Sequence, residues 1–391
     1  MKKQLPVSVI TIGLAIFTML FGAGNIMYPV NAGVMAGSKN YIGIFGFLLT
    51  GVLLPIIGLV AMILFDGDYK KFFNRIGRVP GFLAILFCML IIGPFLVMPR
   101  CVTVPYAMLA PFLPAVGLPI FSFLFCLAVF ILTYKESQIL TVLGKYISPI
   151  KIGSLCFIVI AGLMGAQATI PQTLPTSTVL LDQVLLGFQT LDLLGALFFA
   201  YVIVRLLKLN DTQHTLSSKQ LALMCLKGGV IAGVFMTTFY VGLSFLGAYY
   251  AHLVDSSMNG AEMFRIIALH VVGQHGVIIL ITAVMMACLS TMAALAAVFA
   301  EYLRNEIFNK KLSYLSSLTI GLIITMIISN FGLTNILKWA ITPINFGYPI
   351  IVTITLCNIA YSLFDFKWIK LPVFITTLAM TWIYVYPYLM A

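Results

Sequence analysis

Residues that disfavour helices interrupt the middle of the first long apolar run, between residues 7 and 30. They are Gly22, Gly24, Asn25 and Pro29. Hydrocarbon tolerates a broken helix only beside a cavity or within protein. The carbonyl groups freed by a break can coordinate a cation, and the N-terminus of the following half-helix can face an anionic group. The alternative is a Gly-x-Gly face for close packing, but Asn25 and Pro29 together favour the break.

A second apolar run, between residues 180 and 207, carries an acid near its middle. Asp192 follows Asp182 by about 10 residues, or about 15 Å along a helix. A carboxylate at that depth costs about 2.5–3.5 kcal/mol on insertion scales, so we expect Asp192 to face protein or water and to take part in binding. The alternative is a structural carboxylate that caps a half-helix or pairs with Arg100. The small and polar residues around it are Gly187, Gln189, Thr190 and Gly195.

Adjacent hydroxyl groups occur at Ser290 and Thr291, inside another apolar run. Hydroxyl oxygens are hard ligands that suit Na⁺ if they face the first break, although Ser and Thr commonly bond back to their own helix. Arg100 counts as the one cation well inside a span, in a run that contains Pro94 and Pro99. We expect its guanidinium to pair with an acid or to cap carbonyls of a broken helix rather than to meet a substrate carboxylate.

The composition restricts the class of protein that can hold these residues. Of 391 residues, 62% are hydrophobic and 8% are charged, against about 45–50% apolar and about 25% charged in an average soluble domain. So few charges cannot cover a globule of 42.9 kDa. This excludes a soluble enzyme, a disordered protein and a nucleic-acid-binding domain. The seven Cys all fall in apolar runs, which predicts buried hydrophobes rather than disulfides or a metal site.

The apolar runs number eleven, and a span needs about 20 apolar residues. We expect a multi-pass, all-α integral membrane protein without a soluble domain. The runs lie near residues 7–30, 41–65, 80–110, 118–134, 149–168, 180–207, 226–250, 271–300, 313–331, 335–363 and 371–390.

Lysine and arginine positions indicate how these spans are oriented. If the N-terminus is cytoplasmic, eighteen of the 22 Lys and Arg fall in inner segments, Lys151 among them, and three fall in outer segments. Arg100 lies within a span. This asymmetry follows the positive-inside rule. It predicts a cytoplasmic N-terminus and, with eleven spans, a C-terminus on the outer side.

The two interrupted spans are the first and the sixth, and five spans reverse the direction of insertion. Two units of five spans with paired interruptions at the bilayer midplane are typical of the LeuT-like 5+5 inverted repeat with discontinuous helices 1 and 6. We therefore expect one transmembrane domain over residues 1–391. Its repeats would cover about 7–168 and about 180–363, followed by one extra C-terminal helix at about 371–390.

Six short segments, in order along the chain, resemble the branched-chain amino acid:cation symporters of the BrnQ type (the LIVCS family of the APC superfamily). Any one of them would be a weak signal, but together they cover nearly the whole chain. They are FGAGNIMYP at 21–29, IGPFLVMPR at 92–100, LGKYISPIK at 143–151, TLDLLG at 190–195, ACLST at 287–291 and SNFGL at 329–333.

The resemblance implies import of Leu, Ile and Val through a bacterial cytoplasmic (inner) membrane, in symport with Na⁺ or H⁺. The superfamily's pattern implies Na⁺ between carbonyls near Thr18 and Phe21 and the hydroxyls of Ser290 and Thr291. It also implies substrate contacts of three kinds. The substrate carboxylate would meet N–H groups near Ala23, Gly24 and Asn25. The substrate ammonium would meet carbonyls near Gly187–Thr190 with Asp192, and apolar side chains such as Phe188 would line the rest. The expected substrate residues are therefore Ala23, Gly24, Asn25, Gly187, Phe188, Gln189, Thr190 and Asp192.

Several alternatives follow from the same residues. The coupled ion would be H⁺ if Asp192 carried it, and the substrate would include other apolar amino acids such as Met. An enzyme is not expected, because the 11 acidic residues are scattered over loops. No cofactor other than the co-transported ion and no nucleic acid partner is expected beside the lipid bilayer. Members of the family usually have twelve spans, one more than the eleven expected here.

Overall fold

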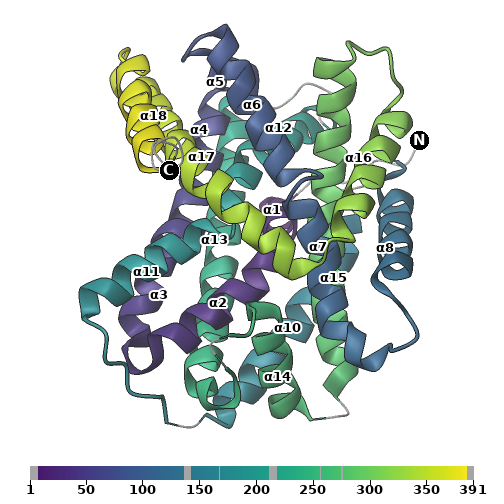
Figure 1. Ribbon diagram of the computed structural model, residues 1–391. Helices are drawn as coiled ribbons and strands as arrows, with labels where there is room; N and C mark the ends of the chain where they lie inside the picture. The colour runs from purple at the N-terminus through teal and green to yellow at the C-terminus, as the bar shows by residue number, and fades with distance from the viewer. Residues whose placement is uncertain are drawn as a thin grey trace.

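The computed structural model describes residues 8–135, 142–166, 168–210, 218–255, 257–273 and 276–384, and these residues form helices and no strand (Figure 1). Their α-helices are α1(Val9–Leu20), α2(Ala23–Ala36), α3(Asn40–Leu48), α4(Leu54–Leu64), α5(Tyr69–Asn74), α6(Arg78–Ile92), α7(Val97–Leu109), α8(Leu118–Thr133), α10(Ser148–Met164), α11(Thr176–Phe188), α12(Asp192–Asn210), α13(Ser218–Tyr249), α14(Gly260–Val272), α15(Val277–Tyr302), α16(Tyr314–Ser329), α17(Leu333–Phe364) and α18(Lys370–Tyr384).

Seven helical stretches of the described residues are long and apolar enough to cross a membrane. Three shorter apolar helices are α1, α8 and α16. Because α1 and α2 are two parts of the first apolar run, length alone does not give the number of spans, and the expected eleven stays a prediction.

The first break separates α1 from α2 at residues 21–22. The backbone N–H of Gly22 donates to Asn25 Oδ1 at 2.9 Å, so Asn25 caps the second half-helix. A Cβ on Gly22 would lie 2.7 Å from Thr291 Oγ1, which explains why this position needs glycine. The predicted break is confirmed, but Pro29 lies within α2 and does not form it.

The second break separates α11 from α12 at residues 189–191. Leu191 has a φ of 64°, a left-handed conformation that is rare for a residue with a Cβ, and Asp192 then begins α12. Gly187 lies inside α11, where a Cβ would meet Thr50 Oγ1 at 2.1 Å. Gly187 therefore permits close helix packing, and the turn at residues 189–191 makes the break.

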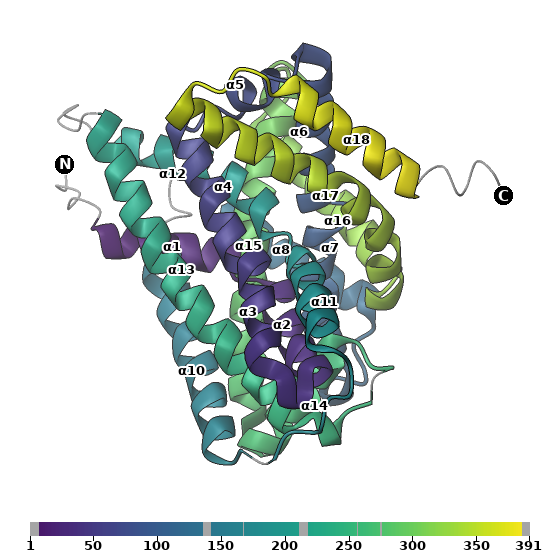
Figure 2. The ribbon, with the colours of Figure 1, turned by 90° about the vertical axis from the view of Figure 1, so that its left-hand side faces the viewer.

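The two breaks meet at the centre of the bundle, where other helices enclose them. Helix α13 packs along both α1 and α2, while α15 packs against α10, α7 and α1. In Figure 1, α1 lies near the middle of the molecule, with α13 and α15 on either side of it, and in Figure 2 α13 passes in front of α1. This enclosure keeps lipid away from the backbone groups that the breaks leave open.

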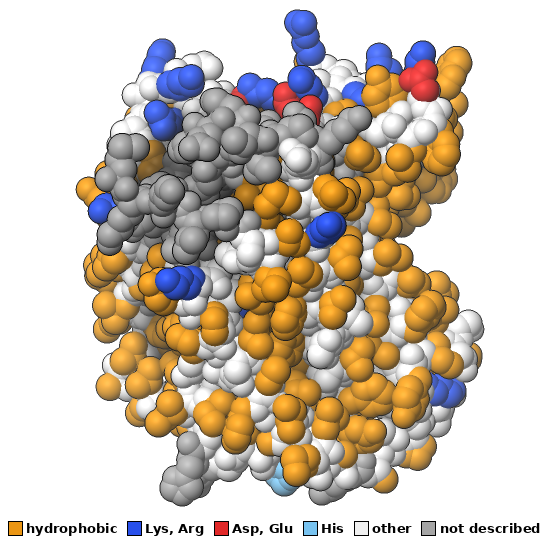
Figure 3. Space-filling model, turned by 180° about the vertical axis from the view of Figure 1, so that it is seen from behind, with side chains coloured by type: hydrophobic (Ala, Val, Ile, Leu, Met, Phe, Trp, Pro, Cys, Tyr) orange, Lys and Arg blue, Asp and Glu red, His pale blue; other side chains and the backbone are white. Residues whose placement is uncertain are grey.

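The outer surface carries the pattern expected of a membrane protein. In Figure 3, Lys and Arg side chains gather along the top edge of the molecule, and the face below is largely hydrophobic. Large exposed apolar side chains include Leu185, Phe157 and Ile131. The seven Cys are free, and six of them are buried, as expected of small hydrophobic residues.

Candidate functional site

The carbonyl groups at the first break point at one buried cation. Lys151, from α10, places its Nζ 3.1 Å from the Thr18 carbonyl oxygen and 3.1 Å from the Phe21 carbonyl oxygen. It lies 3.4 Å from Ser290 Oγ of α15. The Lys151 side chain has no exposed surface. Three of the four residues expected to hold Na⁺ thus surround a lysine ammonium.

The hydroxyl groups near this ammonium differ in what they contact. Ser290 donates to the Thr18 carbonyl at 3.0 Å and also back to Ala287 of its own helix at 2.9 Å. The Thr18 hydroxyl pairs with that of Ser148 on α10. Thr291 Oγ1 lies against Gly22, is buried and has no hydrogen-bond partner. The structure therefore brings Thr18, Phe21 and Ser290 together and turns Thr291 toward the substrate pocket described below.

Counting Lys151 among the loop cations was wrong, because the structure buries it at the centre of the bundle. Its Nζ also faces the rings of Phe17 and Phe21, 4.9 and 5.6 Å from their centroids. The signal was present in the sequence, since Lys151 lies inside the apolar run at 149–168 rather than before it. A cation inside a span is expected to pair with an acid or to cap carbonyl groups, as the sequence predicts for Arg100.

The second break also has a buried cation at its carbonyl end. Arg100, from α7, donates from Nη1 to the Gln189 carbonyl at 2.9 Å and from Nη2 to the Thr190 carbonyl at 3.1 Å. Only 1% of Arg100 is exposed. The expectation that Arg100 caps the carbonyls of a broken helix is confirmed.

Asp192 links the two breaks to α13. Its carboxylate accepts from Asn25 Nδ2 at 2.5 Å and from the Tyr240 hydroxyl at 2.8 Å. Asn25 lies in the first turn of α2, Asp192 begins α12 and Tyr240 lies in α13, so three elements share one carboxylate. The acid is 4% exposed. These contacts support a structural part for Asp192 and leave its second oxygen toward the substrate pocket.

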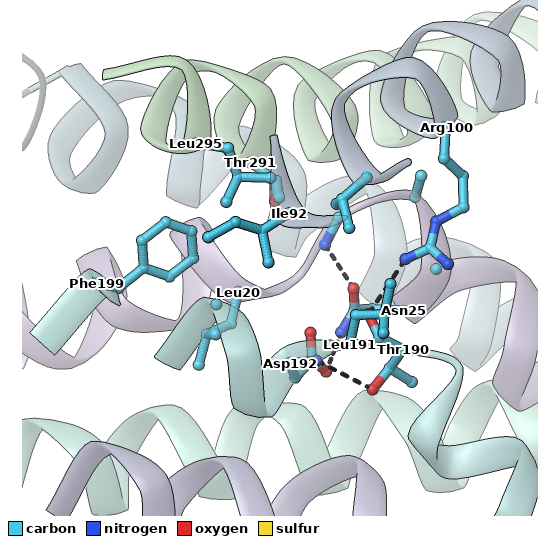
Figure 4. A pocket seen from close by; sticks show the side chains of 15 residues that line it. Leu20, Asn25, Ile92, Arg100, Thr190, Leu191, Asp192, Phe199, Thr291 and Leu295 are labelled. Carbon is cyan, nitrogen blue, oxygen red and sulfur yellow. Dashed lines mark hydrogen bonds between the residues drawn. The ribbon is translucent and has the colours of Figure 1, made fainter. Parts of the chain in front are cut away.

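One pocket, called the substrate pocket below, lies between the breaks and has a cavity volume of about 20 Å³, close to the space of one water molecule. Figure 4 shows polar groups on one side and apolar side chains on the other. Its lining includes the expected residues Ala23, Gly24, Asn25, Thr190 and Asp192. Other residues that line it are Leu20, Gly22, Ile92, Val97, Arg100, Leu191, Gly195, Phe199, Thr291 and Leu295.

Three expected substrate residues lie outside this lining. Gly187 packs against Thr50. The ring of Phe188 lies 5.0 Å from that of Tyr348. Gln189 turns its carbonyl to Arg100. The apolar wall is instead formed by side chains from α6, α7, α12 and α15, which no local sequence pattern brings together.

The chemistry of the substrate pocket suits a zwitterion with an apolar side chain. The first N–H groups of α2 lack partners within their helix and carry its positive end. A Cβ on Gly24 would lie 2.7 Å from Arg100 Nη2, so the guanidinium stands directly beside this turn. These positive groups can attract a carboxylate, and Asp192 can attract an ammonium. The wall formed by Ile92, Phe199 and Leu295 can enclose an aliphatic chain.

Comparisons with known proteins place the chain among its relatives. The family described as "Branched-chain amino acid transport protein" matches residues 6–386. The branched-chain amino acid permease BraB of Bacillus subtilis is 33% identical over 373 residues, which cover 93% of this chain and 82% of that protein. BrnQ of Escherichia coli, also a branched-chain amino acid permease, is 28% identical over 359 residues, or 90% of this chain and 80% of BrnQ.

Solved structures show the same fold at low sequence identity. Mhp1, a nucleobase-cation-symport-1 family transporter, superposes with a TM-score of 0.63 at 13% identity and covers 98% of this chain and 96% of its own. MhsT in complex with L-phenylalanine superposes with a TM-score of 0.62 at 16% identity, covering 96% and 98%. The fold is therefore LeuT-like, as expected from the paired interruptions.

Proposed function

Because the chain belongs to the branched-chain amino acid transport protein family, we propose that it imports leucine, isoleucine and valine by cation-coupled symport with alternating access. The protein is a membrane transporter and not an enzyme. The observation that carries the proposal is the substrate pocket between the two breaks. It combines a helix N-terminus, one guanidinium, one carboxylate and an apolar wall, the four elements that an aliphatic α-amino acid requires.

Each group of the substrate has an assigned partner in this proposal. The carboxylate binds the N-terminal turn of α2 at Ala23, Gly24 and Asn25, next to Arg100. The ammonium binds near Thr190 and Asp192. The side chain enters the apolar wall. Selection among Leu, Ile, Val and Met then depends on single methylene groups, each worth about 1–3 kcal/mol in an apolar pocket.

The proposal has two versions, which differ in the coupled ion. In the first, Na⁺ binds oxygens of Thr18, Phe21, Ser290 and Thr291, as the resemblance implies. In the second, Asp192 carries H⁺ between the two breaks, and the imported amino acids include Met. The contacts of Lys151 with three of the four expected Na⁺ ligands favour a version without Na⁺ at that place.

We also propose a bacterial cytoplasmic membrane with the N-terminus inside and the C-terminus outside. The Lys and Arg side chains along one end of the molecule in Figure 3 support this orientation, because positive charges are retained on the cytoplasmic side. Labelling of single cysteines placed at exposed positions near Arg78 and near Lys338 with an impermeant reagent tests it. Labelling of the Arg78 site from outside intact cells would reverse the assignment.

The test of function is uptake of labelled leucine into proteoliposomes at fixed pH and zero membrane potential. Exchange against internal leucine is expected, and excess unlabelled isoleucine or valine should compete while lysine should not. Replacing Na⁺ by choline, and separately dissipating a pH gradient, distinguishes the two coupling versions. Asp192→Asn should abolish uptake driven by the pH gradient if Asp192 carries H⁺. Absence of leucine exchange under every cation gradient would refute the substrate assignment.

A further inference from the structure

We propose that the Lys151 ammonium is a resident cation at the first helix break, which occupies the place of a transported Na⁺ and makes leucine binding independent of Na⁺. The inference rests on the proposed function, since it concerns the ion requirement of the same transport cycle.

The number and direction of contacts around Lys151 match an ammonium group. An ammonium has three N–H donors and no acceptor. Lys151 Nζ has three oxygen neighbours, namely the carbonyls of Thr18 and Phe21 at 3.1 Å each and Ser290 Oγ at 3.4 Å. These oxygens come from the end of α1, the break itself and α15. They are the hard ligands that a monovalent metal ion would use.

Among the residues that the structure describes, no carboxylate contacts Lys151, and other groups compensate the buried charge. Helix α1 ends at Leu20, so its negative C-terminal end faces the ammonium. Two aromatic faces, Phe17 and Phe21, add cation–π attraction at 4.9 and 5.6 Å. A Na⁺ bound to the same oxygens would compete for their lone pairs and repel a positive charge a few ångströms away. The site therefore accommodates one cation, and the chain supplies it.

A tethered cation has a different consequence from a dissociable one. A bound Na⁺ would link α1 and α15 only while its concentration is high, whereas Lys151 joins α10 to both helices permanently. Removing its side chain would leave the oxygens of Thr18, Phe21 and Ser290 without their cation. Thr291 Oγ1, buried and without a hydrogen-bond partner, lies against Gly22 on the side of the substrate pocket and is not one of these oxygens. The shortened side chain should thus create a Na⁺ site.

The experiment measures binding of labelled leucine to purified protein in Na⁺ and in choline at equal ionic strength and pH. Wild-type affinity is expected to change less than about twofold between the two salts. Lys151→Ala is expected to lose at least about tenfold in choline and to recover most of that loss in Na⁺, a factor of ten being about 1.4 kcal/mol. Thermal unfolding gives a readout without leucine, in which Na⁺ should raise the midpoint of Lys151→Ala and not that of the wild type.

Lys145→Ala is the matched control, because Lys145 is exposed and lies six residues earlier in the same segment. It should behave as the wild type in both salts. Tenfold tighter leucine binding by the wild type in Na⁺ would overturn the inference, as would a folded Lys151→Ala without any response to Na⁺. A wild type that binds no leucine in either salt would instead refute the proposed function.

Should Lys151→Ala not fold, Ser290→Ala provides the second variant. It removes one acceptor of the ammonium and keeps Lys151. If Lys151 is the resident cation, Ser290→Ala weakens leucine binding by the same factor in Na⁺ and in choline. Weakening confined to Na⁺ solutions would identify Ser290 as a Na⁺ ligand and overturn the inference.

Discussion

The two helix breaks are built alike, each with a buried cation, but the two cations face different parts of the molecule. At each break, the carbonyl end of the first half-helix is held by a buried cation from a third helix, Lys151 at α1 and Arg100 at α11. Lys151 is a point charge outside the lining of the substrate pocket, whereas Arg100 is a planar fork that lines it. This difference predicts that the first cation governs the ion requirement and the second governs the substrate.

The helix dipole explains why both positions take a cation. Each half-helix presents several unpaired carbonyl groups at its C-terminus, equivalent to about half a negative charge. Neither water nor lipid can satisfy these groups deep in the bundle. A lysine or arginine from a neighbouring helix can do so. Asp192 lies across the second break from these carbonyl groups, at the N-terminus of α12, where it accepts hydrogen bonds from Asn25 and Tyr240.

The largest expected effect comes from replacing the planar guanidinium of Arg100 with the ammonium of a lysine. Arg100→Lys keeps the charge but cannot reach both the Gln189 and Thr190 carbonyls, which lie 2.9 and 3.1 Å from two different nitrogens. Each hydrogen bond between a charged group and a buried carbonyl contributes about 1.5–3 kcal/mol, and both are disturbed here, so we expect leucine exchange to fall by about 100-fold or more. Measuring exchange in proteoliposomes tests this, with the exposed Lys338→Arg as a control. Near-normal exchange by Arg100→Lys would show that charge alone suffices at both breaks.

The next effect concerns the acid between the breaks. Asp192→Asn keeps the shape of the side chain but removes the negative charge that faces the substrate ammonium. Hydrogen bonds to charged groups contribute about 1.5–3 kcal/mol, which corresponds to leucine binding weaker by about 10- to 100-fold. Binding of a leucine analogue that lacks the amino group should change less than binding of leucine. Equal losses for both ligands would assign Asp192 a structural part only.

How far the sequence predicts the site can be judged from these same residues. The breaks, Asn25, Asp192 and the capping by Arg100 were predictable, because helix breakers and charges inside apolar runs have few physical explanations. Ile92, Phe199 and Leu295 were not, since an apolar residue in an apolar helix carries no sign of which face meets the substrate pocket. The burial of Lys151 could have been predicted in the same way as that of Arg100. It was missed because its position near the start of a run favoured a loop cation.

A smaller effect should separate a pocket residue known only from the structure from one suggested by the sequence. Phe199 lines the substrate pocket, and Phe188 packs against Tyr348 outside it. Phe199→Ala removes part of the apolar wall and enlarges the substrate pocket. Bulkier amino acids such as phenylalanine should then compete with leucine about tenfold better, an effect in the range of one to two methylene groups. Phe188→Ala should leave the order of competitors unchanged. A selectivity change in Phe188→Ala alone would restore the prediction from sequence.

The smallest expected effect tests the link between the second break and α13. The Tyr240 hydroxyl donates to Asp192 at 2.8 Å and also contacts Asn25, so Tyr240→Phe removes one donor and keeps the ring packed on Phe47 and Phe21. A single hydrogen bond contributes about 0.5–1.5 kcal/mol, and one to a charged group somewhat more. We therefore expect leucine affinity to fall by about fivefold with little change in the unfolding midpoint.

The same variant also separates the two breaks. If each cation governs its own break, Tyr240→Phe weakens leucine binding equally in Na⁺ and in choline, because the lost hydroxyl contacts Asp192 and Asn25 and not the oxygens around Lys151. Combined with Lys151→Ala, its effect should add to that of the lysine variant within about 0.5 kcal/mol, since the lost hydroxyl and the lost ammonium have different hydrogen-bond partners. A strongly non-additive pair would mean that Asn25, in the first turn of α2 after the first break, transmits changes between the two sites.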